Sequence, residues 1–157
     1  MQQSGGGRFF EDFTVGDVIA HALARTINES DNTLFTMLTM NTNPVHFDAE
    51  YAKQTAFGQI LVNSCFTFSL AVGLSTGDLS RHVFANLGWN EIVLPAPVFL
   101  GDTVRARSEV LSTRDSASRP DVGIVEVQTT GTNQRGEKVI SFKRTFMVYR
   151  RGHGPQA

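Results

Sequence analysis

The sequence predicts one α+β domain in which an antiparallel β-sheet wraps around a long, central, apolar helix. Three observations lead to this prediction. A strand-like segment lies near the N-terminus, the longest apolar stretch lies in the middle of the chain, and four strand-like segments fill the C-terminal half. A sheet with one apolar face must bury that face, and the apolar helix is available to cover it. A chain of 157 residues is long enough for one such core.

The N-terminal half is predicted to contain one strand and two short helices. Residues 18–27 carry β-branched residues at both ends and form the expected first strand. Residues 31–39 place apolar side chains at helical spacing, and Ser30 can cap that helix. Asp48 can cap a second helix over residues 49–54, because its carboxylate can accept hydrogen bonds from the first backbone N–H groups.

The longest apolar segment, residues 59–74, is predicted to be a buried helix. It lacks the alternation of a strand and exceeds the usual strand length, and Gly73 and Gly77 are expected to end it. Four later segments rich in Val, Ile, Thr and Phe are predicted as strands, over residues 81–94, 103–114, 123–133 and 138–149. The residues Asn133-Gln-Arg-Gly136 are expected to form the hairpin turn between the last two strands.

The domain is predicted to span residues 9–149, between disordered tails over residues 1–8 and 150–157. His153 then belongs to a tail and is not expected to be a ligand.

Lys and Arg total 14 against 15 acidic residues, so no positive field favours nucleic acid or an anionic membrane. The single cysteine, Cys65, favours a reducing compartment. Because we find neither a signal-peptide pattern nor an apolar stretch of membrane-spanning length, we expect a cytoplasmic protein.

The chemically most informative segment is Asn41-Thr-Asn-Pro-Val-His-Phe-Asp48, which precedes the apolar helix. Pro44 has a fixed φ and keeps Asn43 out of the helical region, so the backbone is extended as it presents His46. An imidazole titrates near neutral pH and can act as a general acid and a general base. His46 is therefore a candidate catalytic residue, although taken alone it is equally compatible with a packed histidine.

This segment resembles the Asp-x-Asn-Pro-aliphatic-His motif of the MaoC-like dehydratases, also called (R)-specific enoyl-CoA hydratases. The matching residues are 41–46, followed by Phe57-Gly58, Asn63-Ser64 and the block 97–104, and the resemblance covers residues 9–149. Residues 39–43 and 84–89 look closest to the branch that includes mesaconyl-CoA hydratase (β-methylmalyl-CoA dehydratase). The resemblance implies a hot-dog fold with an acyl-thioester channel at the interface of a homodimer. A homodimer is also favoured by the open edge of the predicted sheet.

The resemblance further implies roles for four residues. His46 acts as base and acid, while Asn41 stands where the family has a catalytic aspartate. An amide can orient a water molecule, but it cannot accept a proton at neutral pH. The backbone N–H of Ser64 matches the family's oxyanion donor, which is a glycine there. Asn63 takes the place of the family's second histidine, where its amide could hydrogen-bond the substrate or brace the loop. Asn63 and Ser64 are also compatible with an ordinary polar helix start.

The departure at Asn41 leaves three interpretations open. His46 works alone with Asn41 holding the water, Asp48 supplies the missing carboxylate, or the site only binds acyl-CoA. Helix capping is the simpler interpretation of Asp48. The remaining candidates for substrate contact are Asn43, Trp89 and Arg119, the last through the phosphates of CoA, and each is also compatible with a structural or solvent-exposed role.

The sequence contains no spacing typical of zinc ligands and no Gly-rich nucleotide-binding motif, so no metal and no cofactor is expected. His21 and His82 are expected to lie outside any cluster. The leading hypothesis is a lyase that adds water to an α,β-unsaturated acyl-CoA, or removes it, with a short branched dicarboxylic acyl-CoA such as mesaconyl-CoA as a candidate substrate. The alternatives are a non-catalytic acyl-CoA binder or inactive partner subunit, and a hot-dog acyl-CoA thioesterase.

Overall fold

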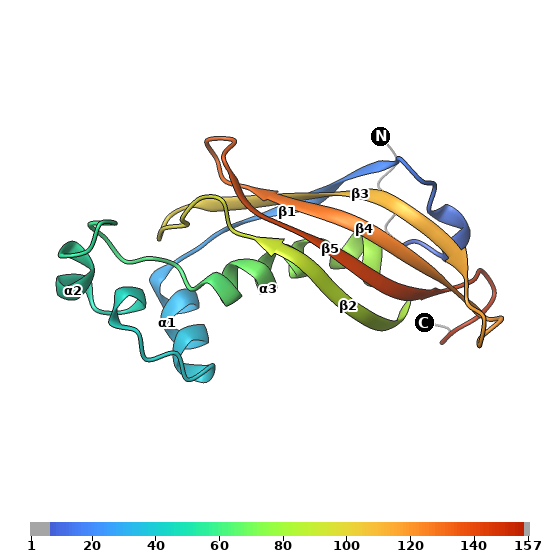
Figure 1. Cartoon of the computed structure of the whole chain (residues 1–157), viewed down its shortest axis with the longest axis horizontal. Coiled ribbons are helices and arrows are strands. Elements are labelled where there is room, and N and C mark those ends of the chain that lie inside the picture. Colours follow the sequence, from blue (N-terminus) through green and yellow to red (C-terminus); the bar gives the residue numbers. More distant parts are fainter. Residues whose placement is uncertain (1–6, 156–157) are drawn as a thin grey trace.

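The computed structural model describes residues 7–155, which form one five-stranded sheet with a helix along one face and two helices beyond one end (Figure 1). The strands are β1 (Val18–Thr26), β2 (Val83–Val93), β3 (Thr103–Asp115), β4 (Val122–Thr132) and β5 (Lys138–Tyr149). The α-helices are α1 (Glu29–Leu38), α2 (Ala49–Lys53) and α3 (Ser64–Leu74). Two 3-10 helices, η1 (Phe10–Asp12) and η2 (Pro44–His46), and the π-helix η3 (Thr76–Ser80) complete the chain.

The sheet is antiparallel throughout and has the strand order β1-β3-β4-β5-β2. Its inner face carries buried apolar residues such as Val127 and Phe142, and α3 lies along this face (Figure 1). Phe68 of α3 packs edge-on against Phe142, with 5.0 Å between the ring centroids. The predicted α+β domain, with its sheet wrapped around a central helix, is confirmed. The five predicted strands agree with β1–β5 to within two residues at each end.

The first helix begins earlier than predicted. Asn28 caps α1, since its side-chain oxygen accepts a hydrogen bond from the N–H of Asp31 at 2.8 Å, and the Asp31 carboxylate accepts from the N–H of Asn28 at 3.2 Å. The prediction of Ser30 as the cap is therefore wrong, because this reciprocal pair forms two residues upstream. The cap of α2 is confirmed, since Asp48 accepts hydrogen bonds from the N–H groups of Glu50 and Tyr51.

The central helix begins later than predicted. Residues 59–63 are not helical, because this segment pairs with the chain before β3. Leu61 forms an isolated bridge with Phe99, and the N–H of Val62 donates to the carbonyl of Val98 at 2.9 Å. An apolar run without alternation cannot distinguish such a buried extended segment from a helix. The predicted stops also differ, because Gly73 lies within α3 and Gly77 lies within η3.

Parts of both predicted tails are bound to the domain. The guanidinium of Arg8 donates to the backbone carbonyl of Asp78 at 3.4 Å. The N–H of Arg150 donates to the carbonyl of Asp121 at 3.0 Å, and Arg151 pairs with Asp12 at 2.6 Å. These three residues of the predicted tails are therefore bonded to the domain, whereas residues 1–6 and 156–157 lie outside the described part of the chain. Of the helices between residues 7 and 155, none combines the length and the apolar character needed to cross a membrane.

Candidate active site

The loop that presents His46 is shaped by two asparagine side chains. The side-chain oxygen of Asn41 accepts a hydrogen bond from the N–H of Asn43 at 3.1 Å, and that of Asn43 accepts from the N–H of Val45 at 3.2 Å. Pro44 opens η2, where its fixed φ suits the first helical position and its missing N–H removes no hydrogen bond. Asn41 and Asn43, which we predicted as water- and substrate-binding groups, therefore use their oxygens to build the loop.

His46 is held by one ring nitrogen and open at the other. Its Nδ1–H donates to the carbonyl of Leu61 at 2.8 Å, which places the ring proton on Nδ1 in the neutral imidazole. Nε2 makes no hydrogen bond within residues 7–155, yet no fully buried side-chain nitrogen or oxygen in that range lacks a partner. Nε2 is therefore not fully buried, although the residue as a whole is only 7% exposed. Its lone pair is available to accept a proton.

The start of α3 is fixed by Asn63. The Oδ1 of Asn63 accepts a hydrogen bond from the N–H of Cys65 at 2.9 Å, and its Nδ2 donates to the hydroxyl of Thr36 at 3.2 Å. Its own N–H donates to Oδ1 of Asn32 at 2.9 Å. Of the two roles considered for Asn63, the structure assigns its side chain to bracing. The N–H of Ser64 has no partner among the described residues, and such a group at the positive end of a helix dipole can bind a negatively charged oxygen.

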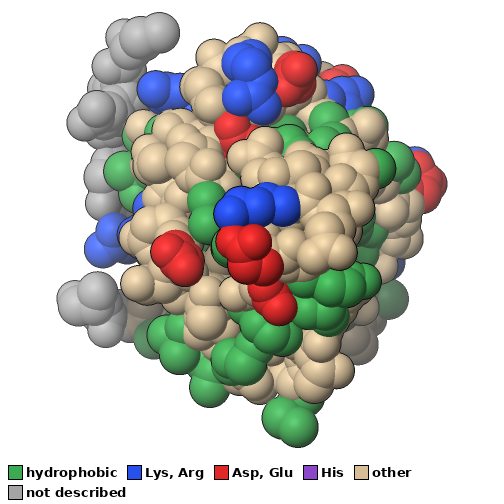
Figure 2. All heavy atoms as spheres, turned by 90° about the vertical axis from the view of Figure 1, so that its left-hand side faces the viewer, with side chains coloured by type: hydrophobic (Ala, Val, Ile, Leu, Met, Phe, Trp, Pro, Cys, Tyr) green, Lys and Arg blue, Asp and Glu red, His purple; other side chains and the backbone are tan. Residues whose placement is uncertain are grey.

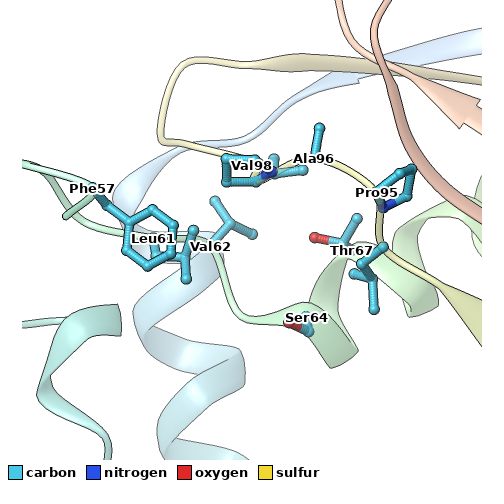
Figure 3. Close-up of a pocket in the computed structure, with 10 residues that line it drawn as sticks. Phe57, Leu61, Val62, Ser64, Thr67, Pro95, Ala96 and Val98 are labelled. Atoms are coloured by element: carbon cyan, nitrogen blue, oxygen red, sulfur yellow. The ribbon is translucent and has the colours of Figure 1, made fainter. Parts of the chain in front are cut away.

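A pocket of about 270 Å³ opens beside this helix start (Figure 3). The residues that line it are Phe57, Leu61, Val62, Ser64, Thr67, Leu94, Pro95, Ala96, Pro97 and Val98. In Figure 3, Ser64 and Thr67 project from α3, and the Thr67 hydroxyl points into the space toward Val62. His46 is not a lining residue, but Leu61 lines the pocket and its carbonyl holds the imidazole. Leu61 thus joins the histidine to the pocket.

Three further predicted residues lie away from this arrangement. Asp48 uses its carboxylate to cap α2, as its simpler interpretation predicted, and within the described chain it makes no hydrogen bond to His46. Trp89 lies on β2 and packs edge-on against Phe68, with centroids 5.8 Å apart, outside the pocket lining. Arg119 lies in the β3–β4 loop, at the opposite end of the sheet from α1 and α2 (Figure 1), where it pairs with Asp121 at 3.0 Å.

His21 lies in a polar cluster, contrary to our prediction. Its Nδ1–H donates to the carboxylate of Asp78 at 2.9 Å, and its Nε2 accepts from the hydroxyl of Ser108 at 2.9 Å, which also bonds Thr129 at 2.8 Å. Burial lowers the pKa of His21, while the hydrogen bond to the Asp78 carboxylate opposes this effect. Ser108 and the side chain of His21 are fully buried, so neither the hydroxyl nor the imidazole has access to a substrate. No group of three or more His, Cys, Asp or Glu residues between 7 and 155 is placed to hold a metal ion.

Sequence reasoning missed three residues that shape the site. Asn32 and Thr36 lie one turn apart on α1 and are both fully buried against the start of α3. Thr67 is the buried polar residue of the pocket. A signal was present for the first two, because polar residues four apart on the inner face of an amphipathic helix require partners in the core. The partners themselves lie too far along the chain to be read from local pattern.

The fold and the site together define the class: a MaoC-like hot-dog domain with a histidine beside the start of its central helix. The family model described as mesaconyl-CoA hydratase matches residues 2–155, and the chain belongs to that family. It is 36% identical over 149 residues to a mesaconyl-CoA hydratase of Cereibacter sphaeroides, covering 95% of this chain and 43% of the relative. An (R)-specific enoyl-CoA hydratase of Rhodospirillum rubrum is 33% identical, with 92% of this chain and 94% of the relative covered.

Among solved structures, a MaoC-like dehydratase from Rhodospirillum rubrum superimposes with a TM-score of 0.82 at 29% identity, covering 94% of this chain and all of that one. The chain spans less than half the length of the mesaconyl-CoA hydratase relative, but nearly the full length of the enoyl-CoA hydratase relative. It therefore corresponds to one hot-dog unit, whereas the longer relative contains additional chain.

Proposed function

We propose that this protein hydrates an α,β-unsaturated acyl-CoA thioester, or dehydrates the corresponding 3-hydroxyacyl-CoA. The observation that supports the proposal is that His46 uses only one of its ring nitrogens: Nδ1 bonds the carbonyl of Leu61, a residue that lines the pocket together with Ser64, and Nε2 has no hydrogen-bond partner among the described residues. A base with a free nitrogen and an unpartnered N–H at a helix start are the two groups that this reaction requires.

In the proposed mechanism, the thioester carbonyl accepts a hydrogen bond from the N–H of Ser64 at the pocket. Nε2 of His46 removes a proton from water, and the resulting hydroxide forms a C–O bond with the β-carbon. The electron pair of the double bond moves to the α-carbon and the carbonyl oxygen, where the Ser64 N–H stabilises the enolate. Nε2–H then returns its proton to the α-carbon. The Leu61 carbonyl supports the transient imidazolium through Nδ1–H.

Asn41 is proposed to support the loop rather than to act as a base. Its oxygen is engaged with the N–H of Asn43, and its NH₂ group can donate to a water but cannot accept a proton. Because Asp48 is committed to the α2 cap, we infer that His46 performs both proton transfers without a carboxylate partner.

The acyl group is proposed to be short and branched. The pocket walls are largely apolar, formed by side chains such as Phe57, Val62 and Val98, with Ser64 and Thr67 as polar positions. A methyl branch would be buried favourably against such walls. Mesaconyl-CoA, the substrate named for the 36% identical relative, is a candidate by kinship. Crotonyl-CoA is the unbranched substrate for comparison.

The location of the protein in the cytoplasm remains a prediction.

A second copy of the chain is proposed to pair along β2. This edge strand exposes a row of large apolar side chains, namely Phe84, Leu87, Trp89, Ile92 and Val93. An open, apolar edge is a template for another strand. Further apolar side chains, including Leu38 and Met40, are exposed on and near α1 and α2. Figure 2 views this end of the molecule and shows hydrophobic side chains gathered in its lower half. A second copy would take the place of the extra chain in the longer relative.

The test is the loss of the conjugated enoyl-thioester absorbance when purified protein meets crotonyl-CoA or mesaconyl-CoA. We expect hydration with both, and no free thiol by a thiol-reactive dye. Release of CoA thiol instead would identify a thioesterase. Binding without turnover would favour the acyl-CoA binder, which the engaged oxygen of Asn41 makes the second candidate.

A further inference from the structure

We propose that Asn32 is a positioning residue that holds the catalytic histidine and the oxyanion N–H in register. The inference rests on the proposed function. Asn32 lies on α1, outside both the His46 loop and α3, and its side chain is fully buried. Its Nδ2 donates to the backbone carbonyl of His46 at 2.7 Å, and its Oδ1 accepts from the N–H of Asn63 at 2.9 Å.

One amide therefore connects the two halves of the site. His46 supplies the base, and Asn63 directly precedes Ser64, whose N–H faces the thioester in the proposed mechanism. The same Nδ2 also lies 3.5 Å from the carbonyl of Leu61, the group that holds the imidazole. Three backbone groups, the carbonyls of His46 and Leu61 and the N–H of Asn63, thus meet the side chain of Asn32.

Direct links between the two halves are few. The N–H of Leu61 donates to the carbonyl of Val45 at 3.1 Å, and the imidazole donates to the carbonyl of Leu61. Neither link spans from the histidine loop to the helix cap itself. A misplacement of reacting groups by about 1 Å can cost about 100-fold in rate. The hydrogen bonds of Asn32, which fix the distance between His46 and the Ser64 N–H and which we call the Asn32 clasp, therefore have a large effect on turnover without touching the substrate.

Thr36 supports the clasp from the next turn of α1. Its hydroxyl accepts from Nδ2 of Asn63 at 3.2 Å, and its carbonyl accepts from the N–H of Asn41 at 3.1 Å. Asn32 and Thr36 of α1 therefore both bond the His46 loop, residues 41–46, and the residue that caps α3, Asn63. A purely structural role for Asn32 predicts a loss of stability alone. A positioning role predicts a loss of turnover in protein that remains folded.

The experiment compares Asn32→Asp with Thr129→Val. Asp retains the shape and can still accept from the N–H of Asn63, but it offers no donor to the His46 carbonyl. Thr129 is equally buried and hydrogen-bonded, at Ser108, in a part of the core away from the pocket. We expect kcat for crotonyl-CoA to fall about 10- to 100-fold in Asn32→Asp with KM changed far less, and to stay near wild type in Thr129→Val. Asn32→Ala replaces the Asp variant if that variant does not fold.

A second measurement does not depend on activity. Nitrogen-15 NMR of the His46 ring reports the Nδ1–H hydrogen bond, and we expect the variant to show a mixture of ring tautomers where the wild type shows one. Wild-type kcat together with a wild-type His46 spectrum in folded Asn32→Asp would overturn the inference. If wild-type protein hydrates no enoyl-CoA, the proposed function fails, while the NMR comparison still decides whether Asn32 positions His46.

Discussion

A buried histidine lies near each end of α3, and the two residues differ in the hydrogen bonds that their ring nitrogens make. His46, near the start of α3, bonds the Leu61 carbonyl through Nδ1 and leaves Nε2 without a partner among the described residues. His21, near the π-helix that follows α3, is bonded at both nitrogens, by Asp78 and by Ser108. Both residues are 7% exposed. The side chain of His21 is fully buried, however, so the exposure of the whole residue does not distinguish the proposed catalytic histidine from the structural one.

The two histidines differ in how many of their ring nitrogens are hydrogen-bonded: one in His46 and both in His21. A buried ring with both nitrogens paired rigidifies the core, because each missing bond would leave a desolvated polar group. A ring with one nitrogen open, held firmly by the other, is poised for proton transfer. A carboxylate of the kind that a catalytic dyad requires stands beside the buried ring of His21, whereas His46 has none among its hydrogen-bond partners.

The largest expected effect comes from His46→Gln. We expect hydration of crotonyl-CoA to fall by about 10²- to 10⁴-fold, since one residue performs both proton transfers. The free energy of unfolding should change little, because the loop keeps the hydrogen bonds of Asn41 and Asn43 and the bond between Asn32 and the backbone carbonyl of residue 46. The absorbance assay and a thermal melt measure the two quantities. Full activity in the variant would refute the assignment of His46.

The matched change at the other end, His21→Gln, should reverse this pattern. It disrupts a buried network of Asp78, Ser108 and Thr129, so we expect a loss of about 1–3 kcal/mol in the free energy of unfolding. Turnover per folded molecule should stay close to wild type. Urea denaturation and the hydration assay measure the pair. A large fall in kcat with unchanged stability would show that the polar cluster takes part in catalysis.

The same residue predicts a pH dependence of stability. Burial lowers the pKa of His21 below its usual 6.5 in the folded state, so the unfolded chain binds more protons between the two values. The contribution of neutral His21 is therefore fully present above pH 6.5 and is lost as the pH falls through the lower, folded pKa. We expect the stability difference between wild type and His21→Gln to shrink from pH 7.5 toward pH 5. A difference that grows on acidification would mean that His21 is charged in the folded protein.

Asn41→Asp tests the comparison from the opposite direction, by placing a carboxylate in the His46 loop. The new carboxylate can still accept from the N–H of Asn43, so we expect stability to change by no more than about 0.5 kcal/mol. If His46 works alone, the hydration rate should stay within about tenfold of wild type. Activity that appears only in the variant would show that the natural site binds acyl-CoA without turnover.

Periodicity and turn chemistry were sufficient to predict the sheet. All five strands follow alternating or β-branched segments, and the cap of α2 follows from Asp48 standing before Ala49. The segment 59–63 could not be predicted, because an apolar run suits a buried strand and a helix equally well. Its extended form depends on pairing with residues 98–99, which lie far along the chain.

The sequence pointed to the segments of the candidate site but not to the contacts of their asparagines. The structure brings the His46 loop and the start of α3 together through Leu61, whose carbonyl bonds the imidazole and which lines the pocket with Ser64. The engagement of Asn41, Asn43 and Asn63 in backbone turns and caps could not be read, because asparagine serves ligands and turns with the same groups. The His21 cluster was missed because Ser108 is 87 residues away in sequence.

The central claim is that Nε2 of His46 is accessible, whereas both ring nitrogens of His21 are hydrogen-bonded in the core. Acylation by diethyl pyrocarbonate, which attacks the unprotonated nitrogen of imidazole, tests this claim when the modified residues are located by mass spectrometry. The account predicts that folded protein is modified at His46, that activity is lost in step, that crotonyl-CoA slows the reaction, and that His21 stays unmodified. A folded, active protein in which His46 resists the reagent as completely as His21 would contradict it.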